Sequence, residues 1–135
     1  MPYGTLLTDT IKSSISGPVT FQNTSGTEVG TLCRAWVNFN GTTSPGTIRA
    51  AFNVSSVTKN SSGNYNVNFT TAFSDTNYCV TGAAKYLASA TGQNLRIGTQ
   101  AYGTAVTTTA VIVNVTSAGN ASETDAEMVN VAIFR

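Results

Sequence analysis

Short segments in which apolar and polar residues alternate run through most of the chain from residue 31 onward. The clearest is Tyr65-Asn66-Val67-Asn68-Phe69, in which the apolar side chains would point to one side and the asparagines to the other. A period of two is the signature of a half-buried β-strand and does not fit the face of a helix. This segment is therefore predicted to be a strand with one face on the core.

The other alternating segments are joined by turns rich in Gly, Asn, Ser and Thr. Strands are predicted at 32–39, 47–54 with a continuation over 54–58, 64–71, 77–84, 94–99, 106–115 and 127–134. Turns roughly 8–12 residues apart are typical of antiparallel sandwiches and barrels. We therefore predict an all-β chain whose body is an antiparallel β-sandwich, jelly-roll-like, with helix in under about a tenth of its residues.

The first 30 residues lack this regularity. Chain breakers stand at Pro2, Gly4 and Gly17-Pro18. The few apolar residues that could dock on another surface are Ile11, Ile15, Val19 and Phe21. Because such a segment cannot form its own core, a partner surface must offset the entropy of ordering it. We predict an extended N-terminal arm over 1–30 that anchors the protein or swaps between subunits, and a β-sandwich body over 31–135.

Large aromatic residues are concentrated in the predicted strands of the first half of the body. The residues assigned to the core or to a subunit interface are Trp36, Phe39, Phe52 and Phe69. Rings of this size are buried on average, which favours that assignment. Trp36 nevertheless shares the less apolar face of its segment with Arg34 and Asn38. An exposed platform on which sugar rings stack is therefore the alternative.

Charged residues make up 10% of the chain, well below the usual quarter, so its surface depends on neutral polar groups. The net charge is +1 and the basic residues are scattered, which argues against nucleic-acid binding. No apolar run approaches 18 residues, so no membrane insertion is expected. The first residues do not resemble a secretory signal, and we expect a protein made and assembled in a cytoplasm. Cys33 and Cys79 are expected to be free, buried cysteines in that compartment.

The sequence predicts a non-enzymatic protein, with no catalytic residues, metal ligands or cofactor. The chain contains no histidine, which removes the commonest general base and metal ligand. Its six acidic residues are spread out, and Glu123, Asp125 and Glu127 are expected in a solvated loop before the last strand. No phosphate-binding glycine loop is present, and no base accompanies Cys33.

A second set of residues is a candidate surface site for carbohydrate or protein. It is formed by loop tyrosines and nearby polar side chains: Lys85, Tyr86, Gln93, Asn94 and Tyr102. Loops that combine aromatic rings with amides and a cation are common binding surfaces. The alternative is that both tyrosines are ordinary turn residues.

Three stretches carry a family resemblance: CRAWVNFNGT at 33–42, IRAAFNVSSVT at 48–58, and the Gly-x-Tyr-x-Val-x-Phe-Thr strand at 63–70. They resemble a module of bacteriophage virion proteins, found above all in tail-fibre and appendage proteins of marine and cyanobacterial phages. The resemblance extends from about Ile11 to Tyr78. It implies a structural protein exposed on the virion.

The same resemblance implies a homotrimeric tail fibre or receptor-binding knob that contacts the host surface. Its partners would be further copies of itself, other virion proteins of the tail or capsid, and a host surface glycan. A capsid decoration or head-fibre protein anchored by the N-terminal arm is one alternative. A cellular carbohydrate-binding module is another, because a sandwich fold by itself does not define a function.

Overall fold

The computed structural model describes residues 8, 10–12, 19–85, 93–97, 105–117 and 122–135. The chain divides into two compact units, Met1–Leu32 and Cys33–Arg135. Every regular element in the described residues is a β-strand, which confirms the predicted all-β class. Among these residues no helix is long and apolar enough to cross a bilayer.

The described part of the first unit is a small antiparallel hairpin of β1 (Phe21–Gln22) and β2 (Glu28–Gly30). Asn23 shapes its turn, because its Oδ1 accepts hydrogen bonds from the amides of Ser25, at 3.0 Å, and Thr27, at 2.9 Å. Among the arm residues named above, Ile11 is 57% exposed, Phe21 is 42% exposed and Val19 is half-buried, while Ile15 lies outside the described residues.

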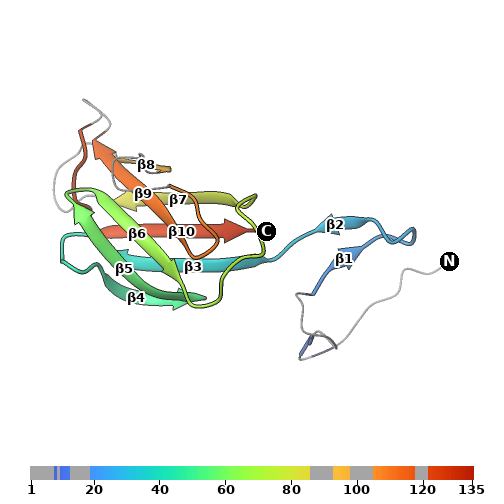
Figure 1. The fold of residues 1–135 in the computed structure, drawn as a ribbon. Coiled ribbons are helices and arrows are strands. Elements are labelled where there is room, and N and C mark those ends of the chain that lie inside the picture. The colour runs from blue at the N-terminus through green and yellow to red at the C-terminus, as the bar shows by residue number, and fades with distance from the viewer. Residues whose placement is uncertain (1–7, 9, 13–18, 86–92, 98–104, 118–121) are drawn as a thin grey trace. The chain divides into compact units, whose positions relative to one another are not determined.

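The second unit is a sandwich of two four-stranded antiparallel sheets, seen as two layers in Figure 1. Sheet I has the order β4 (Thr47–Phe52), β3 (Cys33–Asn40), β10 (Met128–Phe134) and β7 (Cys79–Lys85). Sheet II has the order β5 (Val54–Ser61), β6 (Asn64–Phe69), β9 (Ala110–Ser117) and β8 (Gln93–Ile97). The predicted antiparallel β-sandwich is thereby confirmed.

Segment 54–58, predicted as a continuation of the preceding strand, instead starts β5 in the opposite sheet. The chain changes sheets at Asn53, whose φ of 54° lies in the left-handed region. Asparagine adopts this conformation more readily than most residues, because its short side chain can hydrogen-bond to nearby backbone. A single residue therefore divides one predicted strand into two.

The core lies between the sheets and consists of the inward residues of the alternating strands. Fully buried members include Ala35, Val37, Phe39, Val57, Tyr65, Val67, Val111, Val113, Val115, Val129 and Ile133. The rings of Phe39 and Tyr65 meet edge to face, with centroids 5.1 Å apart. A second aromatic group is formed by Phe69, Phe73 and Tyr78. Phe39 and Phe69 thus lie in the core.

Trp36 and Phe52 do not lie in the core of the single chain, so of the two assignments predicted for them, core or subunit interface, the core is excluded. Trp36 is 39% exposed and Phe52 is 55% exposed. The reason is the period of two itself: Ala35 and Val37 point toward sheet II, so Trp36 must point away from it. The alternative assignment of these two residues to a subunit interface stays a prediction.

The two cysteines are free, as expected, but they are not buried as predicted: Cys33 is half-buried and Cys79 is exposed. Cys33 on β3 and Cys79 on β7 both pair with Phe134, which lies on the strand between them. Two strand spacings separate their Cα atoms by roughly 9–10 Å. A disulfide needs Cα atoms within about 7 Å, so the sheet keeps the two thiols apart.

Asp125 is not the solvated loop residue that was predicted. Its carboxylate accepts hydrogen bonds from Lys59 Nζ at 2.6 Å and from the Gly63 amide at 2.9 Å, and it lies 3.0 Å from the Tyr65 hydroxyl. Burial alone would raise the pKa of Asp125, but these hydrogen bonds together hold it below its ordinary value. The residue therefore ties the segment before β10 to the β5–β6 hairpin.

Candidate functional site

The candidate site begins on the outer face of sheet I, the face turned away from sheet II. Residues directly opposite each other in an antiparallel pair point to the same side of the sheet. One cross-strand row on this face runs from β4 to β7 and consists of Phe52, Trp36, Ala132 and Thr81. The two aromatic rings are therefore neighbours on adjacent strands, and both are exposed.

The next row on this face is small and polar. It consists of Ala50, Asn38, Asn130 and Ala83. The Asn38 Nδ2 atom donates a hydrogen bond to Asn130 Oδ1 at 2.6 Å, which links the two side-chain amides across the strands. We call these eight residues the outer face. Because its other side chains are short, the rings of Trp36 and Phe52 are the bulky groups on it.

A pocket of about 320 Å³ adjoins the outer face at Phe52. Its lining comes from β3, from the corner between β4 and β5, and from the segment after β6: Arg34, Phe52, Asn53, Thr70, Thr71, Ala72 and Phe73. Arg34 precedes Trp36 by two residues on β3, at a point where a β-bulge leaves it unpaired with β10. Because Phe52 belongs to both, the pocket and the aromatic pair form one continuous surface.

Asn53 holds the pocket walls together. Its Nδ2 donates to the carbonyl oxygens of Arg34 and Thr71, both at 3.2 Å, and its Oδ1 accepts from the Thr71 amide at 2.7 Å. Its own carbonyl accepts from the Thr70 amide at 3.2 Å. One side chain thus joins three segments that are distant in the sequence, and the pocket exists before any ligand binds.

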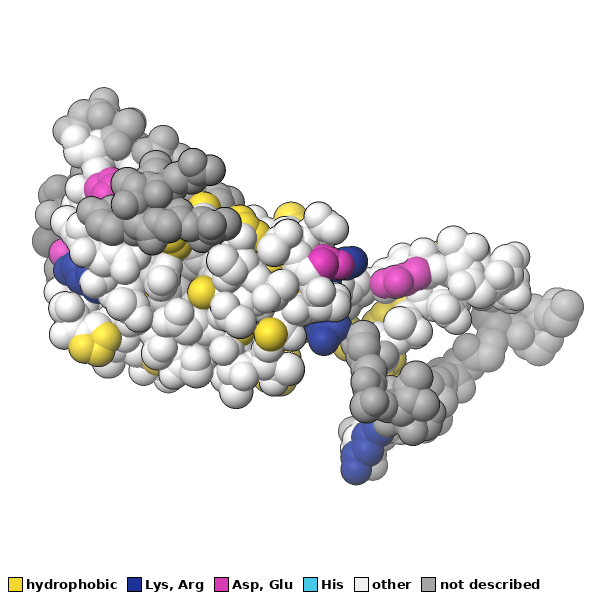
Figure 2. All heavy atoms as spheres, viewed as in Figure 1, with side chains coloured by type: hydrophobic (Ala, Val, Ile, Leu, Met, Phe, Trp, Pro, Cys, Tyr) yellow, Lys and Arg dark blue, Asp and Glu magenta, His cyan; other side chains and the backbone are white. Residues whose placement is uncertain are grey.

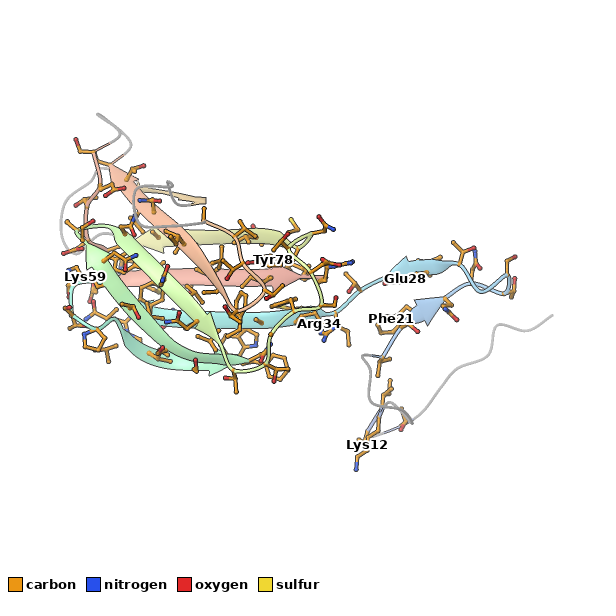
Figure 3. All side chains as sticks on the ribbon, viewed as in Figure 1. Lys12, Phe21, Glu28, Arg34, Lys59 and Tyr78 are labelled. Atoms are coloured by element: carbon orange, nitrogen blue, oxygen red, sulfur yellow. The ribbon has the colours of Figure 1, made fainter. Side chains whose placement is uncertain are left out.

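Arg34 forms no ion pair with an acidic side chain of the described residues. In the part of the chain that the structure describes, the ion pairs are Lys59–Asp125 and Arg135–Asp75, and Arg34 takes part in neither. Figure 3 shows Arg34 and Lys59 at opposite ends of the body. The view in Figure 2 shows few other charged side chains on the body between them. An anion at this end would therefore meet an unpaired guanidinium.

The loop site predicted from sequence cannot be assembled from the described residues. Lys85 ends β7 and is exposed, opposite Met128 of β10. Gln93 and Asn94 begin β8, where their backbones pair with Ser117 and Thr116. Tyr86 and Tyr102 lie outside the described residues. This site therefore stays a prediction.

The arrangement at the outer face and pocket is suited to binding. Exposed rings offer stacking area, the Arg34 guanidinium offers charged hydrogen bonds, and Thr70 and Thr71 offer hydroxyl groups. Among the described residues there is no group of three or more cysteine and acidic side chains that could hold a metal ion. Sequence reasoning missed the pocket because its lining comes from three separate segments.

One solved structure is a distant match to this chain. No family model matches the chain, and no curated protein matches its sequence. A similar solved structure is the phiAB6 tailspike, in complex with three-repeated oligosaccharides of Acinetobacter baumannii surface polysaccharide. The match covers 96% of this chain and 30% of the tailspike chain, at 14% identity and a TM-score of 0.48.

Proposed function

We propose that this protein is a non-enzymatic virion protein of a bacteriophage, a tail-fibre or receptor-binding knob that contacts host surface glycans through the outer face. Support for the virion comes from the resemblance carried by 33–42, 48–58 and 63–70. Support for glycan contact comes from the exposed pair of Trp36 and Phe52. A capsid decoration or head-fibre role is compatible with the same surface, and the two locations are separated by finding the protein in purified particles.

The observation that carries the proposal is the position of Trp36 beside Phe52 on an exposed sheet face. Leaving two large rings partly in water forgoes the stabilisation that burial would give, about 1.5–3 kcal/mol for a fully buried side chain of this kind. Two such residues side by side are therefore a mark of a surface that meets a partner. The weakly polar face of a sugar ring can stack on a flat aromatic ring. The hydroxyls of the sugar can hydrogen-bond to the neighbouring amides of Asn38 and Asn130.

The proposal is tested with the full chain on an array of bacterial surface saccharides. We expect binding to a subset of saccharides, with affinity at least about tenfold weaker for Trp36→Ala and for Phe52→Ala. Because both rings are exposed, each substitution should cost under about 1 kcal/mol of stability. Phe21→Ala removes a ring of similar exposure from the first unit and serves as the control.

Two results would contradict glycan contact at this face. One is that the protein binds no saccharide and no bacterial cell. The other is that Trp36→Ala binds saccharides as well as the unchanged protein does. Because Trp36 is the single tryptophan, a change in its fluorescence on adding a bound saccharide gives an independent check of the contact.

A further inference from the structure

We propose that the pocket beside Phe52 selects saccharides that carry a carboxylate, and that Arg34 is the residue that recognises it. This inference rests on the proposed function, since it names the class of glycan that the same surface would take. Its basis is the pairing of an uncompensated cation with an exposed ring and free hydroxyls in one preformed pocket.

Arg34 brings a positive charge to the lining of this pocket. The guanidinium belongs to a pocket residue and forms no ion pair with an acidic side chain of the described residues. Its planar fork of N–H donors matches a carboxylate in a bidentate arrangement. In a chain with only 10% charged residues, an unpaired arginine in a pocket indicates an anionic ligand more specifically than it would on a highly charged surface.

The remaining lining supplies what a sugar ring needs. Phe52 presents a ring that is 55% exposed, and it borders both the pocket and Trp36. The side-chain hydroxyls of Thr70 and Thr71 make no hydrogen bond to another residue that the structure describes, so they are available to sugar hydroxyls. An acidic peptide would use the arginine too, but it has less need of paired hydroxyls beside an aromatic ring.

The pocket is small, and its walls are fixed. A volume of about 320 Å³ lies at the lower end of small-molecule sites, which suits one acidic sugar residue of a longer chain. The rest of the chain could then continue across the ring of Trp36. Because Asn53 already fixes the walls through four hydrogen bonds, little ordering is needed on binding.

The test uses the full chain and three sets of saccharide probes: carboxylated, sulfated and neutral. We expect carboxylated probes to bind best, with affinity that falls as salt is raised. Arg34→Gln should weaken their binding about 10- to 100-fold, the loss expected for a charged hydrogen-bonded pair. Arg34→Lys should recover only part of it, because lysine keeps the charge without the fork.

Arg49→Gln is the matched control. It removes the same charge from an exposed position on β4 that does not line the pocket, and its binding should equal that of the unchanged protein. Neutral saccharides bound equally well, or an unchanged affinity in Arg34→Gln, would overturn the inference while leaving the proposed function intact. Preference for sulfated probes, or Arg34-dependent binding of polyglutamate in place of saccharides, would also overturn it. Failure to bind any saccharide would instead count against the proposed function.

Discussion

At the scale of single residues, Asp125 is the side chain on which the body should depend most among its charged groups. Replacing it with asparagine removes the charge that holds Lys59, which is 15% exposed, and weakens the contact with the buried Tyr65 hydroxyl. We expect Asp125→Asn to lower the free energy of unfolding by about 1–3 kcal/mol at neutral pH. Chemical denaturation followed by circular dichroism measures this directly.

The stabilisation that Asp125 contributes should depend on pH in one direction. Because the folded state holds the pKa of Asp125 below its ordinary value, its stabilisation is present above about pH 4 and is lost as pH falls through the folded pKa. The difference in stability between the protein and Asp125→Asn should therefore shrink below pH 4. Asp75→Asn, which breaks an exposed pair with Arg135, is the control and should change stability little. An unchanged difference at pH 2 would contradict this account.

At the scale of elements, the arm is expected to attach the protein to its particle. Its apolar side chains Ile11 and Phe21 are exposed in the described part of the first unit, and its hairpin is too small to be stable alone. A chain lacking residues 1–30 should keep the melting temperature of the body, because the core residues named above all follow Cys33 in the sequence. It should fail to rebind particles stripped of the native protein. Rebinding with unchanged affinity would place the attachment surface on the body.

The alternating pattern was sufficient to predict most strands of the body, because a period of two follows directly from half-buried strands. It could not show which face of sheet I a second layer covers, so it left Trp36 and Phe52 assigned either to the core or to a subunit interface. It also could not show the sheet change at Asn53, which depends on one left-handed residue. Asp125 was misjudged for a related reason: loop residues have no period, and its partners Lys59 and Gly63 are more than 60 residues away.

At the scale of the whole molecule, we expect a homotrimer, as the resemblance to phage virion proteins implies. Light scattering should give a mass near three times 14.0 kDa. If the outer face is the glycan surface, a soluble quencher such as acrylamide should still reach Trp36 in the trimer and quench its fluorescence. If acrylamide quenches Trp36 poorly in the trimer but well after dilution separates the subunits, the outer face is a subunit contact. That result would contradict its role in glycan binding. A monomer at micromolar concentration would contradict the trimer itself.

The position of β10 has a consequence for how the protein is made. This strand is the last of the body in sequence, yet it lies inside sheet I, where it pairs with β3 on one side and β7 on the other. Until residue 134 has left the ribosome, β3 and β7 have no strand between them, and the core lacks Val129, Val131 and Ile133. Domains often fold while translation continues. Sheet I of this body cannot be completed before β10 has emerged from the ribosome, so we expect the edges of β3 and β7 that pair with β10 to stay unpaired in the nascent chain until then.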